Sequence, residues 1–404
     1  MTTQVSVDVG EGALVEGEVG EGFEAVSEAF VRNFTELGDL GASLAVYRHG
    51  RPVVDLRGGW ARRSTAAPYG PDTLQLVFST TKGATALCAN LLVQRGLLDL
   101  DAPVTDYWPE FGAAGKQDVP VRWLLTHQVG LPTVDAELTV EEVLAWDPLI
   151  EALAAQAPFW EPGTAHGYHA ITFGYLVGEV VRRVTGLSLG TFFAREVAGP
   201  LGLDFWIGLP ADEEPRVAPL RMARGLPAEA PAQLDAKTIE VYAAMLQPGA
   251  LALRALSLNG ALGAFGGAGG PFNSPELHAA EVPAANGITN APSLARMYAA
   301  MIGEVDGVRL LDPDQLEAAR TLAVAGPDRV LIVDSSFGLG FMTHSDYQLL
   351  LGPGSFGHPG AGGSLGFADP DSGIAFGYVM NQMRFGLSGD KRTTHLIAAL
   401  RSCL

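Results

Sequence analysis

Strand-like patterns at both ends of the chain, with helix-like patterns between them, are the feature that most limits what this sequence can fold into. Toward the N-terminus, two apolar runs, 42–47 and 52–56, are separated by a short turn, as in a β-hairpin. Toward the C-terminus, segments 337–343, 363–368 and 374–380 also have the composition of strands. We therefore predict a single antiparallel sheet to which both ends of the chain contribute.

Helical patterns characterise much of the remaining sequence. Apolar residues recur at helical spacing at 20–37 and repeatedly between about 80 and 195, and a final helix is predicted at 389–404. The predicted fold class is thus α/β (α+β), an antiparallel sheet flanked by helices with an inserted, mainly helical lobe. The predicted domains are a sheet domain of residues 1–80 plus 293–404 and a mainly helical domain of residues 81–292. Within the latter, the Ala-, Gly- and Pro-rich segment 205–292 is predicted to cover a substrate cleft as irregular structure with short helices.

The charge balance excludes several classes of partner. The chain has 404 residues with 45 acidic and 26 basic side chains, for a formal net charge of −19, and it contains no basic run. Proteins that bind nucleic acid cluster Lys and Arg, so nucleic acid is excluded as a main partner. The uncharged stretch 255–275 is long enough to span a membrane, but its six glycines and two prolines indicate a loop, which leaves no membrane segment.

The N-terminus and the cysteines both bear on where the protein works. The N-terminus lacks a basic region followed by an apolar one, so we expect no export signal. The two cysteines, Cys88 and Cys403, do not amount to a disulfide framework and are expected to be reduced thiols. The expected location is the cytoplasm.

Lysine is scarce, and one lysine stands where it could do chemistry. Only four of the 26 basic residues are lysines, and one of them closes the tetrapeptide Ser79-Thr80-Thr81-Lys82 at the start of a predicted helix. Positions three apart share a helix face, so the Ser79 hydroxyl and the Lys82 amine can meet. A hydroxyl is a weak nucleophile unless a base removes its proton, and a desolvated lysine can help to do this whereas arginine cannot. The same spacing also suits a serine that caps a helix beside a surface lysine.

Three further motifs follow in order. They are residues 123–132 (WLLTHQVGLP), residues 160–164 (WEPGT) followed by Tyr168-His169-Ala170, and residues 357–364 (GHPGAGGS). Together with the Ser79 tetrapeptide, their order and spacing resemble the serine β-lactamase-like superfamily over roughly residues 20–400. Within it, the pattern resembles class C β-lactamases, D-Ala-D-Ala peptidases and, most closely, family VIII carboxylesterases.

The resemblance implies a role for each matching residue. Ser79 would be the nucleophile and Lys82 its proton-relay partner. Tyr168 matches the tyrosine that shares the base role and protonates the leaving group. A tyrosine near pKa 10 is a useful base only if a cation stabilises its phenolate, and Lys82 is expected to supply that charge. The backbone amides of Ser79 and Ala361 would form the oxyanion hole.

The third motif departs from the β-lactamase pattern. Where β-lactamases carry Lys-Thr/Ser-Gly, this chain has His358-Pro359-Gly360. The lysine there helps to bind the carboxylate of penicillins and peptides, whereas a histidine is mostly neutral at pH 7. Together with Ala170 at the position of an asparagine, this difference favours neutral esters over β-lactams. The candidate substrate-binding residues are His358, Gly360, Trp160 and His169.

Several other residues could be mistaken for catalytic groups. Residues 362–366 (GGSLG) fit the nucleophile elbow of α/β-hydrolases, but Ser364 leads into a predicted strand where that elbow needs a helix. His127 is interpreted as a histidine hydrogen-bonded within the scaffold. His166 and His169 lie near each other, but no metal-binding motif surrounds them, so no metal and no cofactor are expected.

The sequence therefore predicts a serine carboxylesterase that acts on small neutral esters through an acyl-enzyme. One alternative is an acyltransferase that delivers the same acyl group to an alcohol or amine. Others are β-lactamase or D-Ala-D-Ala peptidase activity, and a catalytically silent ligand-binding protein on the same fold. The presence of Ser79, Lys82 and Tyr168 together argues against the silent protein.

Overall fold

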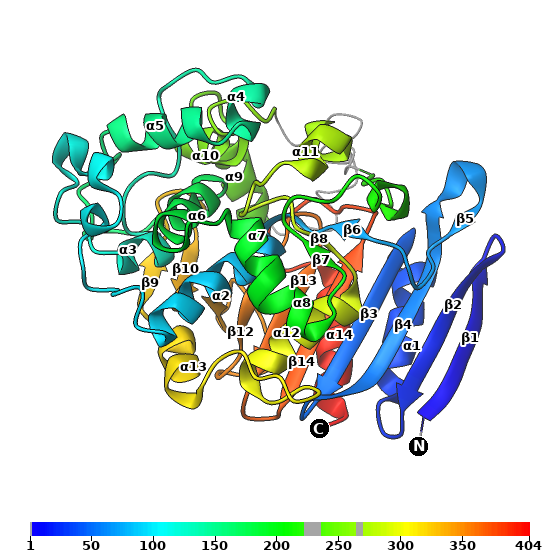
Figure 1. The fold of residues 1–404 in the computed structure, drawn as a ribbon. Helices are drawn as coiled ribbons and strands as arrows, with labels where there is room; N and C mark the ends of the chain where they lie inside the picture. Colours follow the sequence, from blue (N-terminus) through cyan, green and yellow to red (C-terminus); the bar gives the residue numbers. More distant parts are fainter. Residues whose placement is uncertain (1, 222–235, 264–269) are drawn as a thin grey trace.

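A long antiparallel sheet forms the centre of the molecule (Figure 1). The computed structural model describes residues 2–221, 236–263 and 270–404. In spatial order the strands are β1 (Thr2–Gly10), β2 (Ala13–Gly20), β4 (Arg51–Arg62), β3 (Gly41–Arg48), β14 (Ile374–Met380), β13 (Leu365–Asp369), β12 (Phe356–Pro359), β11 (Met342–Thr343), β10 (Asp334–Phe337) and β9 (Val324–Pro327). Strand β5 (Ala67–Pro68) pairs with β4, and β6 (Gln75–Leu76), β8 (Ile288–Thr289) and β7 (Phe205–Trp206) form a separate small sheet. The predicted fold class is confirmed.

Segments from the two ends of the chain meet in the middle of this sheet. Strands β3 and β14 pair antiparallel, from Arg48 opposite Ile374 to Ala42 opposite Met380. Apart from Arg48, both strands are buried, which explains their continuous apolar sequences. The predicted hairpin is β3 and β4, and the strands predicted at 363–368 and 374–380 correspond to β13 and β14.

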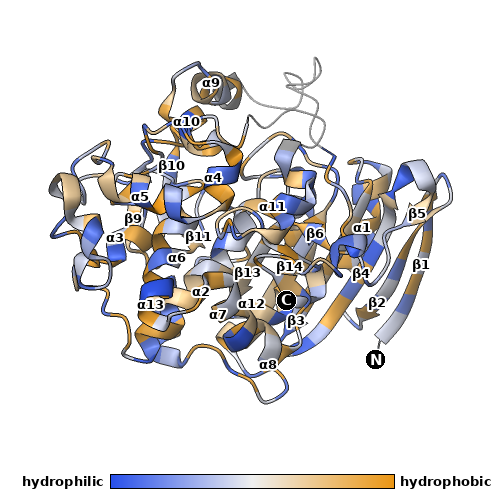
Figure 2. Cartoon of the chain, turned by 45° about the horizontal axis from the view of Figure 1, so that its top comes forward, coloured by the Kyte–Doolittle hydropathy of each residue, from blue (hydrophilic) through white to orange (hydrophobic). Residues whose placement is uncertain are grey.

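Two parts of the sheet differ from the prediction. Segment 337–343, predicted as one strand, is divided between β10 and β11, because the chain turns at Gly338 and Gly340 so that Phe337 pairs with Met342. The hairpin of β1 and β2 is absent from the prediction, because β1 is almost entirely exposed and has no apolar run. Figure 2 shows the mixture of hydrophilic and hydrophobic residues along these outer strands.

Helices cover both faces of the sheet. Helices α1 (Glu24–Thr35) and α14 (Lys391–Ser402), at the predicted positions, pack against each other and enclose one apolar core with the sheet. On the other face, α12 (Ala291–Ile302) contacts β3, β13 and β14 (Figure 1). The remaining helices are α2 (Thr81–Gln94), α3 (Arg122–Leu125), α4 (Val140–Leu144), α5 (Asp147–Ala155), α6 (Thr172–Thr185), α7 (Leu189–Phe193), α8 (Gly199–Leu201), α9 (Ala236–Met245), α10 (Leu251–Ser257), α11 (Pro275–Ala279) and α13 (Pro313–Arg320).

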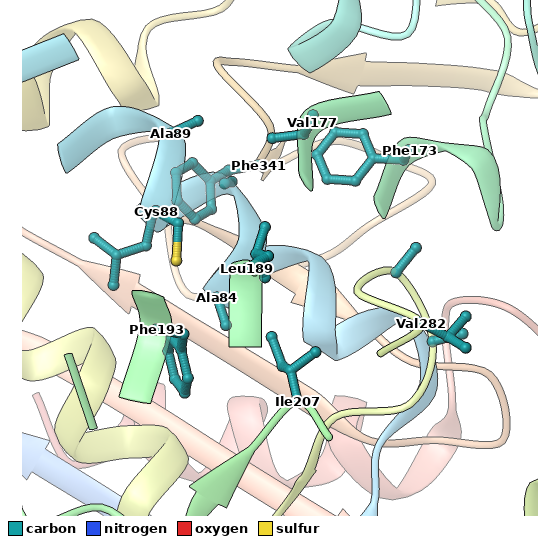
Figure 3. Packing of buried hydrophobic residues seen from close by; sticks show 14 of the residues in the cluster. Ala84, Cys88, Ala89, Phe173, Val177, Leu189, Phe193, Ile207, Val282 and Phe341 are labelled. Atoms are coloured by element: carbon teal, nitrogen blue, oxygen red, sulfur yellow. The ribbon is translucent and has the colours of Figure 1, made fainter. Parts of the chain in front are cut away.

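Helix α2 is buried on all sides for most of its length. Every residue from Thr81 to Leu92 is buried, so small and apolar side chains are needed all around it. The helix contacts α6 and α7, and Figure 3 shows Cys88 near Leu189 and Phe193 in this packing. The packing fixes the start of α2, which is where the Ser79 tetrapeptide lies.

Segment 205–292 contains two short strands besides the predicted short helices, and its covering of a substrate cleft stays a prediction. The described part holds β7, α9, α10, α11 and β8, and residues 222–235 and 264–269 lie outside the described part. The loop predicted at 255–275 therefore lies partly outside it, and its first residues belong to α10. No helix in the described ranges is long and apolar enough to cross a membrane. The boundaries of the two predicted domains stay a prediction.

Candidate active site

Ser79 and Lys82 lie at the tight entry to helix α2. A 3-10 turn over Phe78–Thr80 precedes the helix, and within it Ser79 is partly exposed while both neighbours are buried. Phe78 has a φ of 45°, which is uncommon for a large aromatic residue and often accompanies functional turns. Lys82 lies in the first turn of α2, and its Nζ is 3.2 Å from Ser79 Oγ. The structure thus brings together the two side chains that the i, i+3 spacing pairs.

The Lys82 amine is completely buried and has two further partners. Its Nζ donates to the carbonyl oxygens of Ala170 at 2.6 Å and Ala284 at 3.0 Å. Burial lowers the pKa of Lys82 well below the usual value for lysine, because the charged form is desolvated. Of these three partners, the two carbonyls can only accept hydrogen bonds, whereas the Ser79 hydroxyl can also donate one.

Tyr168 faces the same lysine. The Lys82 Nζ lies 4.7 Å from the centre of the Tyr168 ring. Burial raises the pKa of Tyr168 above its usual value, and a hydrogen bond with Ser79 offsets part of this rise. This electrostatic state differs from the sequence-based expectation of a lysine cation beside a phenolate, because burial disfavours both charges.

The segment that carries Tyr168 has no helix or strand of its own and is held by two other parts of the chain. The Tyr168 N–H donates to Asp328 Oδ1 at 3.0 Å. The Gly167 N–H donates to the His127 carbonyl at 3.0 Å, and the His169 N–H donates to His127 Nδ1 at 3.1 Å. Asp328 is absent from the sequence-based candidates, because the Gly-Pro-Asp turn that contains it says nothing about a contact 160 positions away.

His358 also contacts Tyr168. Its ring stacks on the Tyr168 ring with the centres 5.9 Å apart. His358 Nδ1 donates to the Pro359 carbonyl at 2.7 Å, since a carbonyl can only accept. Burial lowers the pKa of His358 to about 3, so this ring is neutral at pH 7.

The turn after β12 is anchored to the Ser79 turn through Ser364. Ser364 is 1% exposed; its hydroxyl donates to the Val77 carbonyl at 2.8 Å and lies 3.0 Å from Thr80 Oγ1. The Gly360 N–H donates to the Ser364 carbonyl at 2.7 Å, and a side chain at Gly360 would collide with Ser364 and Val77. Ser364 leads into β13, as expected for a residue that is not a nucleophile elbow. The N–H of Ala361, the residue after Gly360, has no acceptor among the described residues.

Comparison with known proteins shows the family of the chain. The sequence model of the Beta-lactamase family matches residues 30–401.

The chain belongs to the beta-lactamase family.

Three proteins resemble this chain over most of its length. "Esterase/beta-lactamase LipL" from Mycobacterium tuberculosis is 38% identical over 377 residues, which are 92% of this chain and 84% of that protein. A solved family VIII carboxylesterase superposes with a TM-score of 0.84 at 38% identity, covering 96% of this chain and all of that one. A penicillin-binding protein homologue from Caulobacter crescentus gives the same TM-score, identity and coverage.

The other predicted substrate-binding residues of this beta-lactamase family member are committed to the scaffold. The Trp160 indole N–H donates to the Ala165 carbonyl at 3.0 Å. His169 is fully buried; its Nδ1 donates to the Gly167 carbonyl at 2.6 Å and its Nε2 accepts from the Leu131 N–H at 2.9 Å. Neither side chain has a free polar atom to offer a substrate.

Two other histidines near the site, His127 and His166, also contact residues of the scaffold. His127 packs edge-on against Phe337 and lies 5.2 Å from the Tyr168 ring, centre to centre. His166 Nε2 bonds to the Ser335 hydroxyl at 2.9 Å. Across the described ranges, no group of three or more His, Cys, Asp or Glu side chains is arranged to hold a metal ion.

A cavity of about 1240 Å³ adjoins the site from the side of β12. Its described lining includes Gly360 and Ser364, which contact the Ser79 turn. Aromatic side chains also line it, among them Tyr242, Tyr347 and Phe385. The cavity is thus next to the Ser79 turn and is partly apolar, as ligand-binding cavities commonly are.

Proposed function

We propose that this protein is a serine hydrolase that cleaves small neutral carboxylic esters through an acyl-enzyme on Ser79. The observation that carries the proposal is the environment of Lys82. Its buried Nζ lies 3.2 Å from Ser79 Oγ and within hydrogen-bond distance of the backbone carbonyls of Ala170 and Ala284. An amine held in this way presents its lone pair to the serine hydroxyl and can accept its proton.

Acylation begins when Lys82 takes the hydroxyl proton of Ser79. The Ser79 Oγ then forms a bond to the carbonyl carbon of the ester, and the carbonyl electron pair moves to oxygen. The backbone N–H groups of Ser79 and Ala361 stabilise this oxyanion. The oxyanion collapses to the acyl-enzyme as the ester C–O bond breaks.

Tyr168 acts on the leaving group. Because burial raises the pKa of Tyr168, its hydroxyl is protonated and can donate a proton to the departing alkoxide. The Lys82 ammonium then returns a proton to the Tyr168 oxygen, which restores both groups. Water attacks the acyl-enzyme by the same steps in reverse and releases the acid.

The neutrality of His358 supports the choice of substrate. A cationic residue at this position would attract a carboxylate, and the stacked, buried ring of His358 supplies no charge at pH 7. The names of the similar proteins, an esterase/beta-lactamase and a family VIII carboxylesterase, agree with ester hydrolysis.

Intact-protein mass spectrometry with p-nitrophenyl acetate tests the proposal. The wild type should gain the mass of one acetyl group during turnover, and Ser79→Ala should gain none. Ser364→Ala is the matched control, because Ser364 is the buried serine bonded to the same turn. An adduct that persists in Ser79→Ala, or disappears only in Ser364→Ala, would contradict the assignment.

Two further assays decide between related activities. Product analysis in the presence of alcohols and amines separates hydrolysis from acyl transfer, which shares the acyl-enzyme. A chromogenic cephalosporin measures β-lactam hydrolysis, which we expect to be slow because no cation stands at position 358.

We also propose that the enzyme works in the cytoplasm on a small-molecule acyl substrate. Cys88 and Cys403 are free thiols, which suits a reducing compartment. Cell fractionation with an antibody against the protein tests the location.

A further inference from the structure

The buried carboxylate of Asp328 bonds to the backbone of Tyr168 and has no role in the mechanism above. Asp328 follows β9, at the start of the loop that leads to β10, and is 3% exposed. Its Oδ1 accepts three backbone N–H groups: Tyr168 at 3.0 Å, Val330 at 2.8 Å and Leu331 at 2.8 Å. Its Oδ2 accepts the Ser335 hydroxyl at 2.9 Å. All four interactions use the carboxylate as an acceptor.

The same carboxylate reaches a second point on the Tyr168 segment. The Ser335 hydroxyl that donates to Asp328 also bonds to His166 Nε2 at 2.9 Å. In addition, the Arg329 N–H donates to the His166 carbonyl at 3.1 Å. The loop from β9 to β10 therefore holds the chain at residues 166 and 168, one on each side of Gly167.

We infer that Asp328 is a positioning residue for the reaction, which fixes the main chain of Tyr168 so that its hydroxyl stays beside Ser79 and Lys82. This inference rests on the proposed function. Asp328 touches neither substrate nor reacting atoms and acts through Tyr168. Because the segment has no helix or strand of its own, its hydrogen bonds to Asp328 and His127 set its position.

Tyr347 interacts electrostatically with Tyr168. The charged and titratable groups in contact with Tyr168 include Lys82 on α2, His127 after α3, His358 on β12 and Asp328 beyond β9. Only the last bonds to the backbone of Tyr168; the others contact its ring. Asp328→Asn therefore leaves the groups that contact the Tyr168 ring in place, while it removes a carboxylate charge that contributes to the raised pKa of Tyr168.

Asp328→Asn tests this role. Asparagine keeps one acceptor oxygen but places an NH₂ donor opposite the Ser335 hydroxyl, which also donates. We expect kcat for ethyl acetate, whose alcohol needs a proton to leave, to fall about 10- to 100-fold with KM nearly unchanged, because small displacements of a catalytic group cost this much. Ser335→Ala, which removes the bonds to Asp328 Oδ2 and His166 Nε2 but leaves the bond from the Tyr168 N–H to Oδ1, should give a smaller fall in kcat.

Asp369→Asn is the matched control. Asp369 is also a buried aspartate, 4% exposed, that accepts from a backbone N–H and from serine hydroxyls, but it lies at the end of β13 in the turn toward β14. The substitution should lower thermal stability as much as Asp328→Asn does, with kcat of the folded protein unchanged. An equal loss of kcat in both variants would overturn the inference.

A double-mutant cycle separates positioning from general damage. If Asp328 acts through the Tyr168 hydroxyl, Asp328→Asn should cost less than about threefold in kcat when made in Tyr168→Phe, since residues that act as a unit are non-additive. Ser335→Ala in the same background gives the same test if Asp328→Asn does not fold. A full additional loss in both pairs overturns the inference. Failure of wild type to form the Ser79 adduct would instead overturn the proposed function itself.

Discussion

Two buried lysines in this protein have nearly the same surroundings and different chemistry. Lys82 donates to the carbonyls of Ala170 and Ala284 and faces the Ser79 hydroxyl. Lys116, which follows a 3-10 segment, donates to three backbone carbonyls, those of Ala113 at 2.8 Å, Ala154 at 3.0 Å and Gln156 at 2.6 Å. Both side chains are fully buried, and burial lowers the pKa of both.

The two lysines differ in the third hydrogen-bond partner of the amine, which is a hydroxyl for Lys82 and a carbonyl for Lys116. A carbonyl can only accept, so three carbonyls need the three N–H groups of an ammonium, and with a pKa of about 8 Lys116 still carries its proton at pH 7. A hydroxyl can also donate, so the third position on Lys82 Nζ can be a lone pair. Burial alone thus does not make a lysine a base; a partner that can give up a proton is also required.

Lys82→Met should have the largest effect, because it removes the amine that is proposed to act as the base. Without the amine, nothing accepts the Ser79 proton, so the rate of acetyl-enzyme formation should fall about a thousandfold. Stopped-flow release of p-nitrophenol measures this rate. Lys116→Met serves as the control and should acylate at the wild-type rate in its folded fraction. A comparable loss of rate in this variant would contradict the assignment of Lys82 as the base.

Tyr168→Phe should have the second-largest effect, a fall in kcat of about a hundredfold. The change removes one hydroxyl and leaves the ring stacked against His358, so proton transfer to the leaving group is lost while packing is kept. The fall should shrink for esters of more acidic alcohols, which leave without a proton. Equal falls for p-nitrophenyl and ethyl esters would contradict the assigned role.

Lys116→Met should affect stability instead of rate. Three buried carbonyl oxygens lose their donor, which should lower the free energy of unfolding by about 2 kcal/mol. Urea unfolding followed by tryptophan fluorescence measures the difference. An unchanged midpoint would show that the ammonium is not a structural link.

The pH dependence of stability gives a second test of Lys116. The pKa of Lys116 is about 8 in the folded protein against 10.5 for an ordinary lysine. Between these two pH values the unfolded chain binds the proton and the folded protein does not, so this group makes stability rise with pH. The difference in unfolding free energy between the wild type and Lys116→Met should therefore widen over this interval and stay constant below pH 8.

Only one of the two lysine sites could be predicted from the sequence. The contact between Ser79 and Lys82 follows from helix geometry, because the two residues are three positions apart. The scarcity of lysine also draws attention to Lys116, but its acceptors at Ala154 and Gln156 lie 38 and 40 positions away, and no spacing rule connects them.

The rest of the site shows the same limit. The place of Tyr168 follows from a family resemblance, not from periodicity, and the electrostatic state of the site depends on burial that a sequence does not record. The overall sheet could be predicted because its central strands are apolar along their whole length. Strand β1 has Val5, Val7 and Val9 alternating with polar residues, which is a strand signal that a search for apolar runs misses. The turn that divides β10 from β11 gives no such signal.

The pairing of β3 with β14 has a consequence for how the protein is made. The Gly41 N–H donates to the side chain of Asn381, 340 positions later, so the middle of the sheet depends on contacts of very long range. Such contacts form late and slowly, because a long loop must close first. During synthesis the Ser79 turn emerges long before β12, β13 and β14, so the nascent chain carries the proposed nucleophile before the proposed oxyanion hole at Ala361 can form. Hydrolytic activity should therefore appear only once the last strands have been translated and have docked.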